Sequence, residues 1–316
     1  MVSSVAFLFP GQGSQAVGMG KSLAEYHAEA RETFAEADSA LGYPLSQLCF
    51  EGPEDKLKLT EITQPAILTV SIAAQRVLAA SGMQPQYVAG HSLGEYSAHV
   101  AAGTLRFADA VRTVAKRGKY MQEAVPVGVG AMAAVLALAL EPLEEVCRQA
   151  QRETAGTVSP ANINSPDQIV ISGSKAAVER AAELAKEKGA KRAVMLPVSA
   201  PFHCSLMQPA QDRLAIDLRG LQFLAPRVPV ITNVDAKPIQ DGDQAREALI
   251  RQVTGAVQWV RSMQLLIESG VQTFVEVGPG KVLTSLLRQI DRSKTGLNVE
   301  NEESLSKTRA ALAGST

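Results

Sequence analysis

The sequence has few of the features that mark secreted or membrane proteins. Only three cysteines occur in 316 residues, Cys49, Cys147 and Cys204. Their odd number and wide spacing suit free thiols in a reducing compartment better than a disulfide framework. No apolar run approaches the roughly 20 residues of a membrane helix, and the run Val5–Phe9 is too short for a signal-peptide core. We therefore expect a cytoplasmic protein without a membrane span.

An excess of charge of one sign is also missing. The 31 basic and 32 acidic side chains leave a formal net charge of −1, and no basic patch stands out along the chain. The chain therefore has no general attraction to nucleic acid or to an anionic membrane. The composition that remains, with 46% hydrophobic residues, 20% charged residues and 24 glycines, is ordinary for a soluble α/β enzyme and excludes a disordered or fibrous chain.

The length favours one large domain that carries a smaller one. Hydrophobic periodicity predicts strands at residues 5–9, 87–89, 228–232 and 273–277, and helices at 19–41, 64–81, 107–121, 244–253, 261–269 and from 281 onwards. Strands and helices that alternate in this way predict an α/β fold with a parallel sheet. The tail after Ile290 is polar and rich in Ser, Glu and Lys, so we expect no ordered element there and assign it no role.

A different rhythm occupies the middle of the chain, after the Pro/Gly stretch Val125-Pro126-Val127-Gly128. The pattern predicts strands at 131–138, 157–163, 168–172 and 192–198, with helices at 143–151 and 176–188. This βαββαβ order is that of the ferredoxin-like split unit. We therefore predict a large domain that begins at residues 1–127, an inserted small domain at 128–199, and the second part of the large domain with the polar tail at 200–316.

One short motif indicates nucleophilic chemistry. Gly90-His91-Ser92-Leu93-Gly94 matches G-x-S-x-G, in which glycines permit a tight strand-to-helix turn that exposes the serine hydroxyl. Five residues alone are equally compatible with an ordinary turn. The predicted strand before the motif and the helix after it favour a nucleophilic Ser92.

A serine needs a base, and the chain has only four histidines. His27 lies in a polar-rich helix, His91 is adjacent to the serine, and His99 lies about two helical turns away. His203 remains, in a loop after the predicted small domain that prolines hold in a fixed path. An exposed loop histidine without a role is the alternative, and we interpret the neighbouring Cys204 as buried packing.

Two further features indicate a bound anion. The glycines of Phe9-Pro10-Gly11-Gln12-Gly13-Ser14-Gln15 follow a strand and can bring backbone N–H groups to a phosphate or an oxyanion. A dinucleotide site is disfavoured, because the third glycine and the acidic residue of that motif are missing. Arg117 lies at the border of an apolar helix stripe, where it snorkels to solvent, pairs with a protein carboxylate, or binds a ligand carboxylate with both nitrogens.

Taken together, several motifs resemble those of the malonyl-CoA:acyl-carrier-protein transacylase family of type II fatty-acid synthesis. They are residues 9–15, 90–95, 116–118, 130–136, 161–166, 199–204 and 275–280, in the order that the family has them. The resemblance spans residues 5–290 and leaves the tail outside. It implies an α/β-hydrolase-like large domain interrupted by a ferredoxin-like small domain, in agreement with the predicted elements.

The resemblance also implies roles for single residues. Ser92 would be the nucleophile and His203 its base, with the backbone N–H groups of Gln12 and Leu93 as the oxyanion hole. The backbone carbonyl of Gln252 would hold the histidine in place of an acid. Arg117 would anchor malonate. The remaining substrate-binding residues implied by the family are Met121, Asn162 and Phe202.

The reaction that the resemblance implies is ping-pong transfer of malonyl from malonyl-CoA to acyl carrier protein through malonyl-Ser92. No cofactor and no metal are expected, since malonyl-CoA is a substrate, and the family implies a monomer. A carboxylesterase or thioesterase is the first alternative, but that fold places its histidine late, and no histidine follows His203. A non-catalytic binding module is the second, and it leaves the presence of Ser92, His203 and Arg117 together unexplained.

Overall fold

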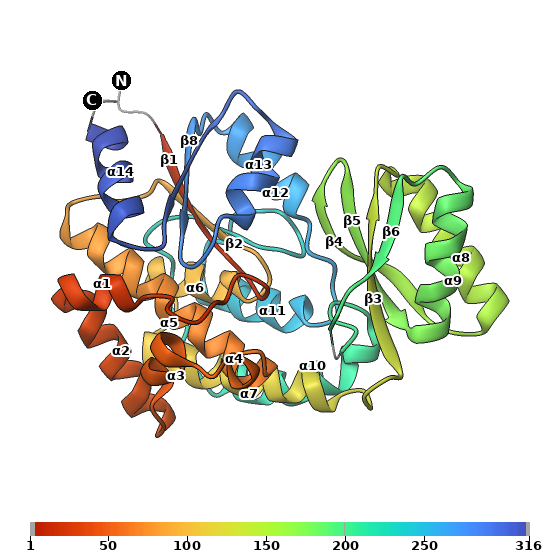
Figure 1. Ribbon diagram of the computed structural model, residues 1–316, viewed down its shortest axis with the longest axis horizontal. Coiled ribbons are helices and arrows are strands. Elements are labelled where there is room, and N and C mark those ends of the chain that lie inside the picture. The colour runs from red at the N-terminus through yellow and green to blue at the C-terminus, as the bar shows by residue number, and fades with distance from the viewer. Residues whose placement is uncertain (1–3, 199, 314–316) are drawn as a thin grey trace.

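The computed structural model describes residues 4–198 and 200–313, which form two lobes of unequal size (Figure 1). The larger lobe contains a five-stranded sheet, and the smaller one contains a four-stranded sheet with α8 (Leu140–Thr154) and α9 (Lys175–Glu187). A parallel sheet and a separate antiparallel sheet confirm the predicted fold class. The domain limits themselves stay a prediction, and Ser199, at one of them, lies outside the described residues.

The large sheet is parallel throughout, in the order β7-β2-β1-β8-β9. Its strands are β1 (Val5–Phe9), β2 (Tyr87–Gly90), β7 (Val230–Ile231), β8 (Thr273–Val277) and β9 (Thr295–Val299). Successive side chains of a strand point to opposite faces. In β1, Phe7 and Phe9 belong to one apolar cluster, whereas Ala6 and Leu8 belong to another. Both faces of the sheet are therefore covered, as is usual for a parallel sheet.

The helices supply these two coverings. The first cluster contains residues of α2 (Ala28–Leu41), α5 (Thr60–Ala80) and α7 (Phe107–Glu123), and the second contains residues of α12 (Trp259–Glu268) and α13 (Val282–Ile290). The other helical elements of this lobe are α1 (Lys21–Tyr26), α3 (Leu45–Glu51), α4 (Glu54–Leu57), α6 (Gly94–Ala101), η1 (Ser205–Met207), α10 (Gln208–Arg219), α11 (Gly242–Gln252) and α14 (Glu302–Ala313). Within the described ranges, no helix has the length and apolar character needed to cross a bilayer.

The small sheet is antiparallel, in the order β4-β5-β3-β6. Its strands are β3 (Gly130–Leu136), β4 (Val158–Ser165), β5 (Gln168–Ser174) and β6 (Arg192–Met195). This order and the βαββαβ sequence of elements are those of the predicted ferredoxin-like unit. One face packs on α8 and α9, while Met132 and Val170 lie on the opposite face against Phe202. The uncovered face of the small sheet therefore points toward the large lobe.

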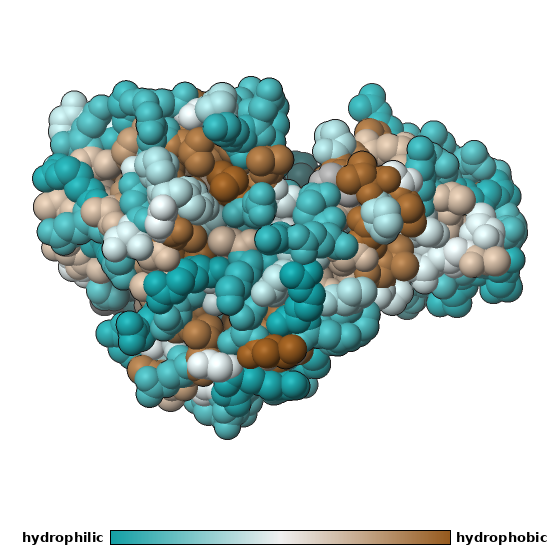
Figure 2. Space-filling view, turned by 90° about the horizontal axis from the view of Figure 1, so that it is seen from below, coloured by the Kyte–Doolittle hydropathy of each residue, from teal (hydrophilic) through white to brown (hydrophobic). Residues whose placement is uncertain are grey.

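The two lobes are joined by more than the connecting chain. The N–H of Ile163 in β4 donates to the carbonyl of Val257 at 2.9 Å, and the N–H of Val257 donates to Ala161 at 2.8 Å. The hydroxyl of Ser165 also donates to Gln289 Oε1 at 2.7 Å. Figure 2 shows a notch in the outline between the two lobes. Strand β4 thus fixes the small lobe beside the carboxyl ends of the large sheet.

Two of the predicted elements were wrong. The predicted helix at 19–41 is two helices, because His27 has extended backbone angles (φ −122°, ψ 128°) between α1 and α2. The tail after Ile290 is ordered and supplies β9 and α14, in which Val299 and Leu305 are fully buried. A few buried apolar side chains are enough to order this segment, although its composition is polar.

Candidate active site

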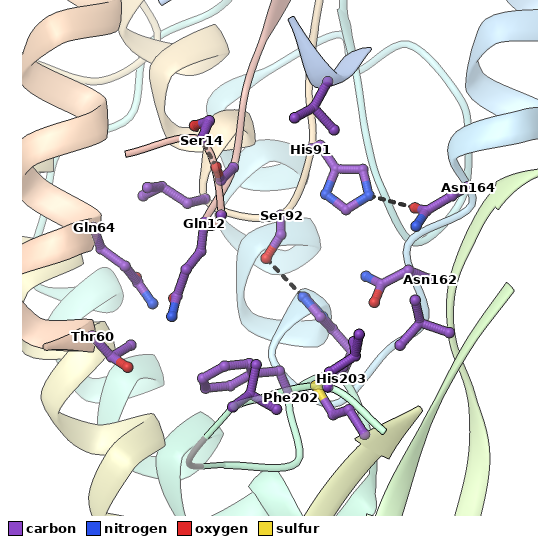
Figure 3. A pocket seen from close by; sticks show the side chains of 18 of the residues that line it. Gln12, Ser14, Thr60, Gln64, His91, Ser92, Asn162, Asn164, Phe202 and His203 are labelled. Carbon is purple, nitrogen blue, oxygen red and sulfur yellow. Dashed lines mark hydrogen bonds between the residues drawn. The ribbon is translucent and has the colours of Figure 1, made fainter. Parts of the chain in front are cut away.

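A pocket of the described chain lies at the carboxyl ends of β1 and β2, where it faces the small lobe. It has a volume of about 560 Å³ and is lined by both lobes. Figure 3 shows Ser92 and His203 facing each other in it, with Gln12 and Gln64 on one side and Asn162 and Asn164 on the other. The carboxyl ends of parallel strands are the usual place for a site in an open α/β sheet, because the loops that follow the strands meet there.

Ser92 occupies a strained turn between β2 and α6. Its φ of 51° lies in the left-handed region, which side chains rarely adopt. The turn is tight, since a Cβ on Gly94 would overlap the carbonyl of Phe9 at the end of β1. Asn233 holds it from the other side, where its Oδ1 accepts from the N–H of Ser92 at 2.6 Å and its Nδ2 donates to Gly90 at 2.6 Å. Contacts on both sides therefore hold the strained backbone conformation of Ser92 in place.

His203 faces the serine through a short hydrogen bond, with 2.7 Å between Ser92 Oγ and His203 Nε2. Its other ring nitrogen, Nδ1, lies 2.9 Å from the carbonyl oxygen of Gln252 and 3.1 Å from that of Gly255. Since carbonyls only accept, Nδ1 carries the proton and Nε2 is left to accept the proton of Ser92. Burial, and then the charge of Arg117, lower the pKa of His203 to about 3, so the ring is neutral near pH 7.

Arg117 reaches the nucleophile from α7, although only 1% of its surface is exposed. Its Nη1 donates to Gln64 Oε1 at 2.8 Å, and its Nη2 donates to Gln252 Oε1 at 2.9 Å and to Ser92 Oγ at 3.2 Å. These acceptors are all neutral, and no ion pair joins Arg117 to a carboxylate of the described chain. Of the alternatives that the helix pattern allowed, Arg117 neither snorkels to solvent nor pairs with a carboxylate of the described residues. The positive charge of Arg117 is therefore not neutralised by the protein, and an anionic group of a ligand can pair with it beside Ser92.

Two backbone N–H groups complete the surroundings of Ser92. Gln12 lies in the turn after β1 and Leu93 directly after the serine, and both residues line the pocket. Neither N–H donates a hydrogen bond within residues 4–198 and 200–313. The hydroxyl of Ser14 steadies the first turn by donating to the carbonyl of Gly11 at 2.8 Å. The pair of N–H groups is therefore free to bind an oxygen that carries negative charge.

The other residues that the sequence pointed to also line the pocket. Met121 and Asn162 are buried and Phe202 is half-buried. Cys204 is not part of the lining; its thiol is buried and donates to the carbonyl of Pro201 at 3.1 Å, as expected of a packing residue. Cys49 and Cys147 are free and buried as well. Every predicted site residue therefore lies around Ser92.

Several polar residues of the site were missed from the sequence. Gln64 and Asn233 contact Arg117 and the Ser92 turn, and Glu95 accepts from the side chain of Gln252 at 2.7 Å. Asn164 Oδ1 lies 2.8 Å from His91 Nε2, which connects the turn to the small lobe. Only Glu95 and Asn164 belong to the sequence motifs described above, at residues 90–95 and 161–166. Gln64 and Asn233 come from segments far along the chain, and no spacing indicates their approach.

Metal chemistry has no evident ligand set in the part of the chain that the structure describes, where no group of three or more His, Cys, Asp or Glu side chains is placed to hold an ion. The polar groups at Ser92 are an imidazole, a guanidinium, amides and backbone N–H groups. This set matches acyl transfer at a serine, in which a base, an oxyanion site and a substrate anchor are needed.

Comparison with known proteins gives consistent relatives over nearly the whole chain. The family model described as acyl transferase domain matches residues 6–312, a range that includes the ordered tail. The malonyl CoA-acyl carrier protein transacylase of Escherichia coli strain K12 is 52% identical over 290 residues, which cover 92% of this chain and 93% of that protein. The protein of that name from Bacillus subtilis is 49% identical over 304 residues and covers 96% of each chain.

Solved structures agree with these relatives. The malonyl CoA-acyl carrier protein transacylase of Coxiella burnetii superposes with a TM-score of 0.96 at 46% identity and covers 99% of this chain and 98% of its own. A malonyl-transacylase in complex with a type II PKS acyl-carrier protein has a TM-score of 0.95 at 45% identity and covers 98% and 100% of the two chains. The likeness therefore extends to both lobes and to the pocket between them.

Proposed function

This chain belongs to the acyl transferase domain family, among the malonyl CoA-acyl carrier protein transacylases, and from that premise we propose that it transfers malonyl from malonyl-CoA to acyl carrier protein. The acyl group is carried by Ser92 between the two substrates. The product supplies chain elongation in fatty-acid synthesis. Transferases of this kind need a nucleophile, a base and an anchor for the acyl group in one pocket.

The observation that carries the proposal is the position of Arg117. Its Nη2 lies 3.2 Å from Ser92 Oγ, in a buried pocket where all its acceptors are neutral. A malonyl group on Ser92 bears a free carboxylate a few bonds from the ester, within reach of this guanidinium. Two parallel charge-assisted hydrogen bonds then hold the carboxylate. An acetyl group offers no such partner and leaves the charge of Arg117 unpaired.

The first half-reaction loads the enzyme. His203 Nε2 takes the proton of Ser92 Oγ as the oxygen attacks the thioester carbonyl, and the N–H groups of Gln12 and Leu93 bind the resulting oxyanion. When the tetrahedral intermediate collapses, the carbon–sulfur bond breaks and the CoA sulfur receives the proton from His203. Malonyl-Ser92 and free CoA are the products, and the ring is neutral again.

The second half-reaction reverses these steps with another thiol. The pantetheine thiol of acyl carrier protein enters the pocket, His203 takes its proton, and the sulfur attacks the ester carbonyl of malonyl-Ser92. The same two N–H groups bind the oxyanion. Ser92 then leaves with the proton from His203, and the malonyl thioester stays on the carrier. One base thus serves both halves, because each half exchanges a hydroxyl and a thiol.

The carbonyl of Gln252 takes the place that an acid has in a Ser-His-Asp triad. Like the acid, it fixes the tautomer of His203 by accepting from Nδ1 at 2.9 Å. Unlike the acid, it adds no negative charge to stabilise the protonated ring. His203 is therefore a weak base, which suits a reaction whose leaving groups include thiolates.

The oligomeric state, location and partners that we propose rest on the same features. The protein acts as a monomer in this proposal, as is usual in the family. The buried free cysteines support a cytoplasmic location. The near-zero net charge supports the absence of nucleic acid and membrane surfaces among its partners. We assign no resident cofactor, since both substrates bring their own reactive groups.

Intact mass spectrometry tests the proposal directly. After exposure to malonyl-CoA, the protein gains the mass of one malonyl group, the Ser92→Ala variant gains none, and addition of holo acyl carrier protein moves the mass to the carrier. A hydrolase is the competing result: the adduct then decays rapidly in buffer alone, and the carrier gains nothing. Such an outcome would assign water as the acceptor and reject the transferase.

A further inference from the structure

Glu95 is a fully buried carboxylate one residue beyond the Ser92 turn, at the start of α6. Its Oε2 accepts from the side-chain Nε2 of Gln252 at 2.7 Å and from the backbone N–H of Asn233 at 3.1 Å. It does not touch Ser92, His203 or Arg117 through any hydrogen bond of the described chain. The mechanism above does not use it, yet leaving a charge buried is costly unless it is compensated.

The contact with Gln252 decides how that side chain is turned. An amide has a donor end and an acceptor end, and the two are set by the groups they meet. The Nε2 of Gln252 donates to Glu95 and to the carbonyl of Ser92, so its Oε1 faces Arg117 Nη2 at 2.9 Å. If the amide turned over, it would present N–H groups to a guanidinium that has only donors. Glu95 thus selects the orientation that Arg117 needs.

The contact with Asn233 holds the nucleophile. The N–H of Asn233 donates to Glu95, and the side chain of Asn233 holds the N–H of Ser92 and the carbonyl of Gly90. Glu95 Oε2 is therefore connected to Arg117 through the side chain of Gln252, and to the strained Ser92 turn through Asn233. These two connections through Glu95 hold Arg117 and Ser92 at a fixed separation.

The charge of Arg117 also favours a carboxylate at the position of Glu95. The histidines near it are neutral, because burial lowers the pKa of His99 and of His203 to about 3 and also lowers the pKa of His91. Arg117 is then the buried cation of this region, and Glu95 lies behind the Gln252 amide that bridges the two. Burial raises the pKa of Glu95 to about 7, against the hydrogen bonds from Gln252 and Asn233 and the charge of Arg117, which lower it.

We propose that Glu95 is a positioning residue for acyl selection, which orients Gln252 so that Arg117 is aimed at the free carboxylate of the acyl group on Ser92. This inference rests on the proposed malonyl transfer. It assigns to Glu95 no contact with the substrate. Its effect is carried by the Gln252 amide, whose main chain also holds His203, so acyl selection and base orientation share one residue.

Two substitutions separate hydrogen bonding from charge. Glu95→Gln keeps an oxygen for Gln252 and Asn233, and its new N–H group points toward His99 Nε2, which lies 3.9 Å from Glu95 Oε1 and has no partner among the described residues. Glu95→Leu has a similar volume but no acceptor, so Gln252 Nε2 keeps only the carbonyl of Ser92 as its acceptor and the amide is held less firmly. Leucine therefore disturbs the aim of Arg117, whereas glutamine preserves it.

The experiment compares loading of Ser92 by malonyl-CoA and by acetyl-CoA, as kcat/KM from rapid-quench mass spectrometry. We expect Glu95→Leu to lower the malonyl-to-acetyl ratio at least tenfold, and Glu95→Gln to keep it within about threefold of wild type, since a lost buried hydrogen-bonded contact is worth about tenfold or more. Glu276→Leu is the matched control. Glu276 is also a buried glutamate. It accepts from the N–H groups of Leu283 and Thr284 at α13 but makes no hydrogen bond to Gln252 or Asn233, so the ratio should not change even though Leu283 lines the pocket.

A double-mutant cycle with Arg117→Ala identifies the route. If Glu95 acts through Arg117, Glu95→Leu changes the ratio by less than about twofold in the Arg117→Ala background. An equal loss for both acyl groups, or the same tenfold change with and without Arg117, overturns the inference. Wild type in the same assay keeps the two hypotheses apart: failure to form malonyl-Ser92 rejects the proposed function, whereas normal loading with an unchanged ratio in Glu95→Leu rejects only the role of Glu95.

Discussion

Around Ser92, single residues divide into one buried cation, Arg117, and several neutral groups that hold it. Arg117 is fixed by the oxygens of Gln64 and Gln252, which compensate part of its desolvation but add no negative charge. A ligand carboxylate is therefore the strongest partner that it meets. Burial, and then the charge of the same cation, keep His203 uncharged by lowering its pKa. Substrate selection and the state of the base are thus coupled at the residue scale.

Replacing Arg117 by alanine removes the anchor but leaves Ser92 and His203 in place. Loss of one partner of a desolvated charge pair costs about 2–5 kcal/mol. We expect kcat/KM for malonyl-CoA to fall by about 100-fold, with acetyl loading retained or increased. Steady-state and rapid-quench assays with both thioesters measure this.

The neighbouring Lys116→Ala serves as control for Arg117→Ala, because Lys116 pairs with Asp217 at the surface and does not line the pocket. Its kinetics should match those of wild type. Unchanged malonyl kinetics in Arg117→Ala would remove this arginine from acyl recognition.

The low pKa of His203 predicts an unusual pH profile. A histidine with the ordinary pKa of about 6.5 would have about 30-fold less free base at pH 5. His203 has a pKa of about 3, so its neutral form persists as the pH falls, and protonation is not significant until well below pH 5. We expect the rate of malonyl-Ser92 formation to change by less than about threefold between pH 7.5 and 5.

Rapid-quench mass spectrometry over this range gives the profile. Glu95, with a pKa of about 7, takes a proton in the same window, so the Glu95→Gln variant isolates its share of any dependence. An inflection near pH 6.5 in both proteins would show that His203 titrates normally and that its burial is relieved in solution.

Local motifs could be predicted at this scale, and long-range partners could not. Ser92 was indicated by its flanking glycines, His203 by elimination among four histidines, and Arg117 by its place on a helix. Asn233 holds Ser92 across 141 positions and Gln64 holds Arg117 across 53. These contacts exist only once the sheet has formed, and a polar residue in a loop or an apolar helix carries no periodic signal for them.

At the scale of elements, the junction of β1 and α6 fixes the site. The first residue of α6 lies against the end of β1, so that Ser92 and Gln12 come from adjacent turns. Substituting Gly94 by alanine places a methyl group on the carbonyl of Phe9, and a backbone atom cannot move away as a flexible side chain would. We expect a loss of about 3 kcal/mol in unfolding free energy and a fall in Ser92 loading of more than tenfold.

Denaturant unfolding and loading kinetics measure the two effects of Gly94→Ala. Gly220→Ala is the control, since that glycine is exposed at the end of α10 and the nearest atom to its new methyl group is 3.3 Å away. It should be close to neutral in both assays. If Gly94→Ala behaved in the same way, the packing of α6 on β1 would be looser than the structure has it.

Elements with strong periodicity were predicted nearly to their ends, and those set by tertiary contacts were not. The strand of residues 5–9 and the α7 helix were found because burial on a face repeats along them. The break at His27 was missed, and the contact found there is with a residue distant in the sequence: His27 Nε2 lies 2.7 Å from Glu302 Oε2 at the start of α14. The short strand β7 was overestimated, since only two of its residues pair with β2.

At the scale of the whole molecule, the C-terminal segment closes the large sheet. Strand β9 pairs with all five residues of β8, and the N–H of Gly278 donates to Val299 at 3.0 Å. The following helix α14 brings the fully buried Leu305 into the core and places Glu302 at His27. The segment that looked like a polar tail therefore packs beside α1, where the N–H of Glu302 donates to the hydroxyl of Ser22.

Deleting residues 292–316 should therefore destabilise the protein rather than trim it. The deletion exposes β8 as an edge strand and removes Val299 and Leu305, each worth about 1.5–3 kcal/mol when fully buried. For a chain of this size, such a loss lowers Tm by roughly 10 °C or more. Differential scanning calorimetry, with light scattering for aggregation, measures the effect. Lys307→Ala removes only an exposed ion pair with Glu303 and should leave Tm unchanged. A truncated chain that melts within about 2 °C of wild type would show that β9 and α14 add nothing to the core, and the site would then depend on residues 4–291 alone.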